Sequence, residues 1–240
     1  MYNRCWTAGS TSAYYLAQKG FRPLVLEKKE FPRDKIGGDA FTQRTHVHLE
    51  RMGVMQKLIE ENKGRWTAQG GLISPSGITY TGDSHAETNV HLVIAVKRKI
   101  MDEMLIRAAV KAGSDLVENY SVKTVEFDKN KGYWVIKSKQ AEQEVYYARI
   151  IVIADGSSST IARSLGIIKD PPQAVCSRSY IKAGTYDFNQ DGLCIYPMKL
   201  VPGYCAFLRE ADDDVVFCCY IIPFGDNKTE NLYKLHHELI

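Results

Sequence analysis

The 240-residue sequence lacks several features that would place it in a broad class at once. It has no apolar run of about 18 residues, so it predicts no integral membrane segment. Its N-terminus lacks the apolar stretch of a signal peptide. Lysine and arginine number 31 against 28 aspartate and glutamate residues, and the absence of a long basic run argues against nucleic acid as a partner. These absences predict a soluble, cytoplasmic protein.

Cysteine and histidine are not spaced as a metal centre requires. None of the six cysteines forms a C-x-x-C pair, and the scattered histidines have no cysteine or carboxylate partner at ligand spacing. The adjacent Cys218 and Cys219 lie in the apolar run VVFCCYIIPF, where a strand would point them to opposite faces. We therefore expect no bound metal, and free thiols buried as small apolar residues in a reducing compartment.

Glycine is scarce where a dinucleotide-binding loop would need it. On G-x-G-x-x-G spacing Gly9 is the third glycine, and the first two places fall on Arg4 and Trp6. A helix is expected to start at Gly9, and the segment RPLVLEK predicts a buried strand that ends at Glu27. Gly9 and Glu27 are 18 residues apart, near the spacing of about 20 between this loop and a ribose-binding acid. Packing of a helix on a strand, without a ligand, explains the same residues.

The remaining patterns predict a mixed α/β fold. A hairpin is expected at 69–83, and residues 173–224 are rich in strand patterns. Helices are expected at 39–62, 96–113 and 157–167, and strands at 121–129, 132–139 and 143–155. We assign residues 1–68 and 100–170 to a dinucleotide-binding domain, and residues 69–99 and 171–240 to an antiparallel β lobe that binds the substrate and is incomplete.

Four short motifs occur in the order in which one enzyme family carries them. They are TAGST (7–11), FPRDK-x-x-GD (31–39), R-x-x-x-D (98–102) and A-D-G-x-x-S (154–159). On these motifs, residues 5–225 resemble the flavin-dependent oxidoreductases of the aromatic hydroxylase type, and most of all the geranylgeranyl reductase group. The resemblance implies an FAD-binding Rossmann-like domain of the glutathione-reductase type. That domain would have a three-stranded crossover and be interleaved with the antiparallel substrate lobe.

The same resemblance implies roles for individual residues, although it assigns no catalytic residue. Each role has a plain alternative: solvated charges for the arginines, a strand-to-helix turn for the Asp-Gly pair, and sheet core for the aromatic residues. In the implied cofactor site, Gly9, Ser10 and Thr11 face the FAD pyrophosphate, and Glu27 holds the adenosine ribose with Lys28 beside it. Arg33 and Arg98 lie near the phosphates, and Asp155 and Gly156 line the cleft. The implied substrate pocket contains Tyr196, Tyr204 and Phe207.

The sequence departs from the pattern of the reductases at several places. Gly37 stands where they usually carry cysteine, so no thiol can act there. In YCAFLR, Ala206 and Leu208 replace the tryptophan and proline of a substrate-lobe motif. No G-D-A-A segment, which would hold the flavin end of the cofactor, is present. These departures lead us to expect that the sequence is a fragment or a truncated gene product of the reductase type.

The resemblance implies reduction of an isoprenoid C=C bond by FAD, with NAD(P)H or another reductant as electron donor. A lipid substrate would bring the protein to a membrane surface as a peripheral protein. Two alternatives stay open. One is a flavin monooxygenase that hydroxylates an aromatic substrate, and the other is an inactive binding module with the FAD fold. Bound yellow flavin would argue against the inactive module.

Overall fold

The computed structural model describes residues 7–83, 92–140, 142–171, 173–185, 189–222 and 231–240. They form two compact units, each built from two separate stretches of chain. Unit 1 is Met1–Arg33 with Met101–Pro172, and unit 2 is Asp34–Ile100 with Gln173–Ile240. The fold is mixed α/β, as predicted. Residues 34–68, which the sequence analysis assigned to the cofactor domain, belong to unit 2, and the functional division of the chain stays a prediction.

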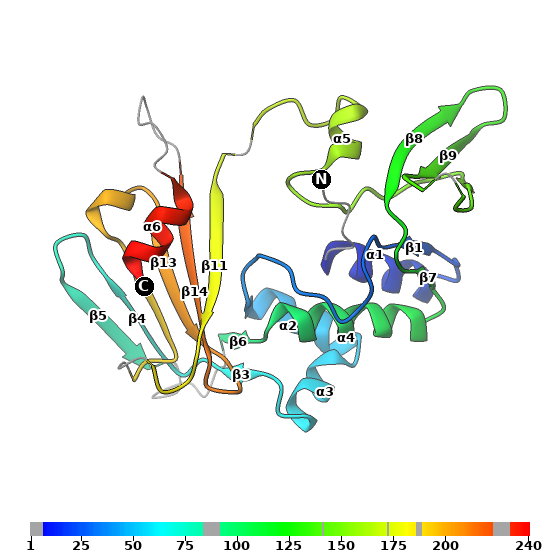
Figure 1. Cartoon of the computed structure of the whole chain (residues 1–240). Helices are drawn as coiled ribbons and strands as arrows, with labels where there is room; N and C mark the ends of the chain where they lie inside the picture. Colours follow the sequence, from blue (N-terminus) through cyan, green and yellow to red (C-terminus); the bar gives the residue numbers. More distant parts are fainter. Residues whose placement is uncertain (1–6, 84–91, 141, 172, 186–188, 223–230) are drawn as a thin grey trace. The chain divides into compact units, whose positions relative to one another are not determined.

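Unit 1 contains two small sheets with helices around them (Figure 1). Strands β1 and β7 pair in parallel, and β8, β9 and β10 form an antiparallel sheet in the order β10-β9-β8. The elements are α1 (Thr7–Gln18), β1 (Leu24–Leu26), α4 (Arg98–Lys111, which enters unit 1 at Met101), β7 (Asp115–Val117), β8 (Val122–Asp128), β9 (Tyr133–Ser138), β10 (Tyr146–Ala148) and α5 (Thr160–Ser164).

The turn from α1 to β1 follows from a single glycine. Gly20 has a φ of +85°, a conformation that costs glycine little and other residues much more. There the Gly20 N–H donates to the Ala17 carbonyl at 2.9 Å and the Phe21 N–H to the Leu16 carbonyl at 3.1 Å, which closes the helix end. The chain then enters β1 and reaches Glu27 one residue after the strand. The predicted helix and the predicted strand are both confirmed here.

The predicted strand at 143–155 is wrong over most of its length. Only Tyr146–Ala148 pairs, with β9, and residues 149–154 form no strand. Their side chains still alternate as in a strand: Ile150 and Val152 are 82% and 60% exposed, while Ile151 and Ile153 pack on an apolar cluster. The apolar run at 150–153 predicted a strand and did not distinguish its two faces. It could not show whether a neighbouring strand was present to pair with it.

Unit 2 contains a six-stranded sheet in the order β11-β14-β13-β12-β4-β5 and a three-stranded sheet in the order β2-β6-β3. Helix α6 contacts β11 and β14 (Figure 1). The elements are β2 (Ala40–Thr42), α2 (Gln43–Arg51), α3 (Val54–Glu60), β3 (Arg65–Trp66), β4 (Gln69–Ile73), β5 (Thr79–Asp83), β6 (Val93–Ala95), β11 (Val175–Ile181), β12 (Gly192–Ile195), a 3-10 turn (Met198–Leu200), β13 (Tyr204–Arg209), β14 (Val215–Ile221) and α6 (Leu232–Leu239).

Two predictions in unit 2 have different outcomes. The hairpin at 69–83 is confirmed, because β4 and β5 pair antiparallel. The single helix at 39–62 is wrong, because the segment splits into β2, α2 and α3. Gly53 separates the two helices with a φ of +68°, a left-handed conformation that an α-helix cannot contain. The helix predicted from the apolar periodicity is confirmed on each side of that glycine, as α2 and α3.

The two faces of the six-stranded sheet have different side chains. One face packs Cys205, Phe217 and Cys219 against Leu235 of α6. The other, which we call the tyrosine face, carries Cys194, Tyr196, Tyr204, Cys218 and Tyr220, as the strand register requires. There the Tyr204 and Tyr220 rings stack with centroids 4.7 Å apart, and Tyr196 follows at 5.6 Å from Tyr204. Cys218 and Cys219 therefore point to opposite faces, as predicted.

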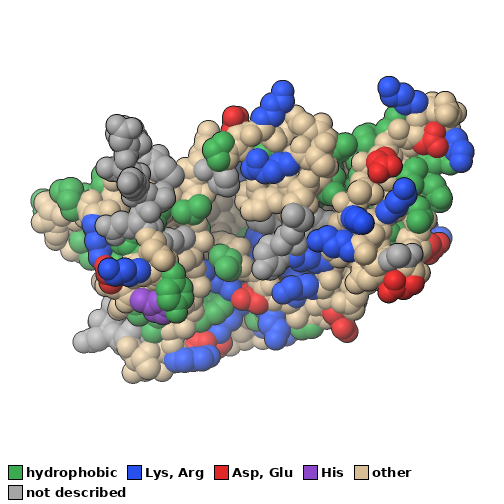
Figure 2. Space-filling view, turned by 45° about the horizontal axis from the view of Figure 1, so that its top comes forward, with side chains coloured by type: hydrophobic (Ala, Val, Ile, Leu, Met, Phe, Trp, Pro, Cys, Tyr) green, Lys and Arg blue, Asp and Glu red, His purple; other side chains and the backbone are tan. Residues whose placement is uncertain are grey.

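Charged side chains of both signs lie close together on the β8–β9 hairpin, at the right of Figure 2. In the described part of the chain, no helix combines the length and the apolar character that a membrane crossing needs. The five cysteines at described positions are free thiols, and Cys205, Cys218 and Cys219 are buried.

Candidate cofactor site

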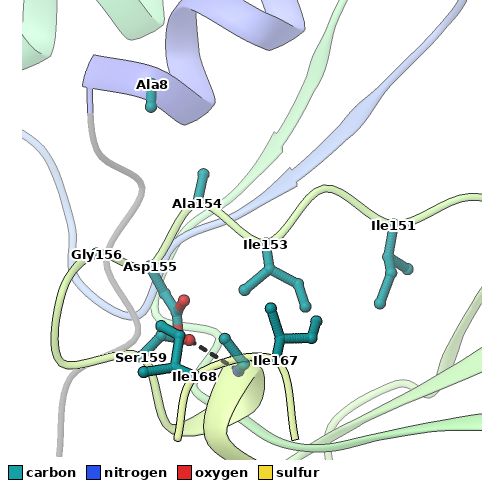
Figure 3. Close-up of a pocket in the computed structure, with 10 residues that line it drawn as sticks. Ala8, Ile151, Ile153, Ala154, Asp155, Gly156, Ser159, Ile167 and Ile168 are labelled. Carbon is teal, nitrogen blue, oxygen red and sulfur yellow. Dashed lines mark hydrogen bonds between the residues drawn. The ribbon is translucent and has the colours of Figure 1, made fainter. Parts of the chain in front are cut away.

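Unit 1 contains a cavity of about 530 Å³ beside the start of α1 (Figure 3). Its wall combines the extended segment 151–156, the first turn of α1, and residues of α5 and of the turn that follows it. Four isoleucines make most of this wall apolar. The lining residues are Ala8, Ile151, Ile153, Ala154, Asp155, Gly156, Ser159, Ala162, Ile167 and Ile168.

Asp155 is the charged residue among those that line this wall. Both of its carboxylate oxygens are buried, and neither has a hydrogen-bond partner among the described residues. Buried polar groups in proteins are nearly always hydrogen-bonded, because an unpaired one loses its hydration without compensation. A carboxylate that lines a cavity and lacks donors is therefore matched by a ligand that brings N–H or O–H groups.

The backbone after Asp155 turns sharply into α5. Gly156 has a φ of +91°, and the Ser159 N–H donates to the Gly156 carbonyl at 2.9 Å. The Ser159 hydroxyl accepts the Ala162 N–H at 2.9 Å and caps α5 (Figure 3). Asp155 and Gly156 thus belong to a tight turn at the rim of the cavity. The turn alternative and the cofactor role are compatible, because Asp155 both precedes this turn and lines the cavity.

The first turn of α1 also reaches the cavity. Ala8 lines it, while Gly9, Ser10 and Thr11 follow in the same turn and Ser10 is buried. The four N–H groups at a helix start have no partner within the helix, and they attract anions. The pyrophosphate role of Gly9, Ser10 and Thr11 stays a prediction. Arg4 and Trp6, the substituted glycine positions, lie outside the described residues.

Glu27 lies in a buried ion-pair network. The Arg33 Nε and Nη2 donate to Glu27 Oε2 at 3.2 and 3.1 Å, and the Lys29 N–H donates to Oε1 at 3.1 Å. Arg33 Nη1 reaches Asp102 Oδ2 at 2.8 Å. Burial alone would lower the pKa of Arg33, but the Glu27 and Asp102 carboxylates outweigh burial and raise that pKa. The network ties the end of β1 to helix α4.

This network bears on three predicted cofactor residues. Glu27 is completely buried, and Arg33 is committed to two carboxylates. Lys28 is half-buried, and none of the three lines the cavity. The roles of Glu27 at the ribose, of Lys28 beside it and of Arg33 at the phosphates stay predictions. The alternative role of Arg33 as a solvated surface charge is wrong, because Arg33 is only 4% exposed.

Arg98 and Gly37 are close together in unit 2. A Cβ atom at Gly37 would lie 2.5 Å from Arg98 Nη1 and 3.1 Å from Lys35 Nζ. Any side chain at position 37 would therefore require the buried Arg98 guanidinium to shift. This contact explains why glycine suits position 37 in this chain. The phosphate role of Arg98 stays a prediction.

The three aromatic residues of the predicted substrate pocket do not share one surface. Tyr196 and Tyr204 lie on the tyrosine face. Phe207 lies on the opposite face, where its ring packs on Phe217 at 4.7 Å in the core beneath α6. Sequence reasoning missed the isoleucines of the cavity. Residues 150–153 are a continuous apolar run, which was interpreted only as part of a strand.

Comparison with known proteins identifies the family of this chain. A model of the family described as FAD binding domain matches residues 7–188. The chain belongs to this FAD-binding family. FAD is accordingly the cofactor of the domain, and the orphaned Asp155 in its cavity fits a ligand that carries hydroxyl and amino donors.

Two relatives and one solved structure show the range of similarity. Conditioned medium factor receptor 1 of Dictyostelium discoideum is 43% identical over 96% of this chain and 47% of its own length. Digeranylgeranylglycerophospholipid reductase of Methanocaldococcus jannaschii is 31% identical over 70% of this chain and 41% of its own length. A geranylgeranyl bacteriochlorophyll reductase-like protein of Thermoplasma acidophilum superposes with a TM-score of 0.74 at 18% identity, over 91% of this chain and 55% of its own.

The matches differ in how much of each relative they cover and in the activity that each relative is named for. The chain spans less than half the length of the two relatives. Reductases and monooxygenases both occur among the matched proteins. The comparisons therefore support a flavoprotein of the oxidoreductase and monooxygenase type, and the solved structure supports the fold.

Proposed function

We propose that this chain forms the FAD-binding part of an oxidoreductase that reduces C=C bonds of an isoprenoid substrate. The observation that carries the cofactor part is the Asp155 carboxylate, with both oxygens unpartnered in a cavity beside the start of α1. Support for the isoprenoid part is the 31% identity with a reductase whose name specifies a digeranylgeranyl lipid.

Each residue of the cavity wall has a distinct task in this proposal. Asp155 accepts hydrogen bonds from hydroxyl or amino groups of the cofactor. The N–H groups of the first turn of α1 attract the diphosphate. Ile151 and Ile153, which pack on the apolar cluster of unit 1, exclude water, which strengthens both interactions. When bound, FAD supplies the hydride for the reduction.

Tyr196 and Tyr204 are the proposed substrate contacts. The Tyr196 and Tyr204 ring centroids lie 5.6 Å apart and Tyr220 stacks on Tyr204, so the tyrosine face has an aromatic surface to which an apolar chain can bind. Phe207 is left out of this contact set because it packs in the core. The electron donor in the proposal is NAD(P)H or another reductant.

Two other functions have support of their own. Hydroxylation of an aromatic substrate has support from the similarity to kynurenine 3-monooxygenase. An inactive binding module has support from the 43% identity with a protein named as a receptor. Incubation of the flavin-loaded protein with NAD(P)H separates the three: saturation of an added isoprenoid alkene, oxygen incorporation into an aromatic compound, or no turnover.

The cofactor part is tested by titrating the protein with FAD and following flavin fluorescence. We expect saturable binding that Asp155→Asn weakens by at least about tenfold, because a hydrogen bond to a charged group contributes about 1.5–3 kcal/mol. Asp170→Asn is the matched control, since the Asp170 side chain is exposed, and it should bind like wild type. Absence of FAD binding by the wild-type protein, or equal affinity of Asp155→Asn, would contradict the proposal.

A further inference from the structure

Unit 2 contains a second carboxyl group without a donor. Glu210 follows β13, at the start of the tight turn into β14, and is 1% exposed. Its N–H donates to the Asp214 carbonyl at 2.8 Å and closes that turn. Both side-chain oxygens are buried without a hydrogen-bond donor among the described residues.

The neighbour of Glu210 is another carboxyl group, that of Asp39. The two lie within hydrogen-bonding reach of each other. Asp39 has donors of its own: the Tyr180 hydroxyl donates to Oδ2 at 2.5 Å, and Arg178 Nη1 to Oδ1 at 3.3 Å. Two adjacent buried carboxylates cannot both ionise without strong repulsion. A proton must lie between them, and Glu210, which lacks donors, is the group that needs it.

The surrounding charges do not remove this need. The charge of Lys97 acts to lower the pKa of Glu210, but this lysine already bridges Asp212 at 2.5 Å and Asp214 at 2.7 Å. The other charged groups of the cluster are paired or face Asp39: Arg178 with Asp34, Lys182 with Asp214 at 2.9 Å, and Arg98, whose charge acts on Asp39. Burial first, and then Asp39, raises the pKa of Glu210 to about 9, against the opposing charge of Lys97.

We propose that Glu210 is a neutral carboxylic acid that donates its proton in a hydrogen bond to the Asp39 carboxylate, and that it thereby positions the segment Gly37–Asp39 on the six-stranded sheet. The Asp39 carbonyl accepts the Val96 N–H at 3.0 Å, so the same residue starts β2 against β6. Gly37 in this segment adjoins Arg98. Glu210 is therefore a positioning residue, and its role does not depend on the proposed flavin chemistry.

The first test is infrared spectroscopy of the full chain. The carbonyl stretch of a protonated carboxylic acid is expected in the wild-type protein at neutral pH, with a loss centred near pH 9. Glu210→Gln should abolish this band, because the amide keeps the hydrogen bond but carries no titrating proton. Glu126→Gln, at an exposed position of β8, is the matched control and should keep it. Persistence of the band in Glu210→Gln would overturn the proposal.

The second test is the pH dependence of folding. Glu210 in the unfolded chain ionises near its usual pKa, so between about pH 6 and pH 8 the folded protein holds one more proton than the unfolded chain. Stability must then fall as the pH rises, with the folding equilibrium constant dropping about tenfold per pH unit relative to Glu210→Gln. Parallel pH profiles of the two proteins would refute the shared proton. Should Glu210→Gln not fold, Asp39→Asn provides the same infrared test, because its amide can donate to an ionised Glu210 and the band should disappear.

Discussion

Asp155 in unit 1 and Glu210 in unit 2 are similar carboxyl groups in different surroundings. Both have two buried oxygens without a hydrogen-bond donor. Asp155 lines a cavity of about 530 Å³, whereas Glu210 faces the carboxyl group of Asp39. An unpaired carboxylate that lines a cavity indicates a ligand that donates hydrogen bonds to it. An unpaired carboxyl group beside another carboxyl group indicates that one of the two carries a proton.

Glu27 is the reference case for this comparison. It is as deeply buried as Glu210, but Arg33 and a backbone N–H supply its donors within the protein. The three carboxyl groups thus differ in the source of the hydrogen-bond donor. It is a protein side chain for Glu27, a ligand for Asp155 and a bound proton for Glu210. Each assignment can be tested by removing the provider.

The largest effect is expected from Arg33→Ala. The change leaves Glu27 and Asp102 buried without their shared guanidinium. Loss of one partner from a buried ion pair costs about 3–5 kcal/mol. Urea unfolding measures this loss in the free energy of unfolding.

Arg22→Ala provides the control for that measurement. The Arg22–Asp115 pair lies at the surface, with side chains 79% and 45% exposed, so its removal should leave the unfolding curve unchanged. An Arg33→Ala protein as stable as Arg22→Ala would show that a buried carboxylate can stay unpaired in this chain. The comparison of Asp155 and Glu210 would then lose its premise.

A smaller effect is expected from Asp155→Asn in thermal unfolding with and without FAD. FAD at 100 times its dissociation constant should stabilise the wild-type protein by about 2.7 kcal/mol, and a tenfold weaker affinity reduces this gain to about 1.4 kcal/mol. Without FAD the variant should unfold no earlier than wild type, because it removes a charge that has no partner. A marked loss of stability in the absence of FAD would mean that Asp155 has a donor within the protein.

The sequence was informative where a local signal decides the structure. Gly20 ended a helix, the turn residues between β4 and β5 marked a hairpin, and the alternation in β14 put Cys218 and Cys219 on opposite faces. The order of four motifs identified the FAD-binding fold. Each of these depends on residues close together in the chain.

The sequence was less informative where partners are distant in the chain. Nothing near Glu210 in the sequence shows that Asp39 lies against it, 171 positions away by their numbers. The apolar run at 150–153 predicted a strand but did not show that a pairing strand is absent. The resemblance placed Arg33 near the phosphates, and its second carboxylate partner, Asp102, lies 69 positions further along the chain in α4. Phe207 looked like a pocket residue because its face of the sheet is set by α6.

The smallest effect is expected from Ser159→Ala. The hydroxyl caps α5 and lines the cavity next to Asp155, and loss of such a cap costs about 1 kcal/mol. The neighbouring Ser158→Ala is the control, since Ser158 is exposed. Chemical denaturation should separate the two variants, while both keep most of the FAD affinity. An FAD affinity that falls as far as in Asp155→Asn would assign the ligand contact to the serine rather than to the aspartate.

The chain passes between the two units three times, after Arg33, Ile100 and Pro172, and the second passage falls inside helix α4. Neither unit can therefore be isolated by trimming one end of the gene, because removing all of one unit from either end also removes part of the other. A stop codon near the middle of the coding sequence would leave two unfinished units instead of one intact half. Obtaining either unit by itself calls for rejoined or permuted chains.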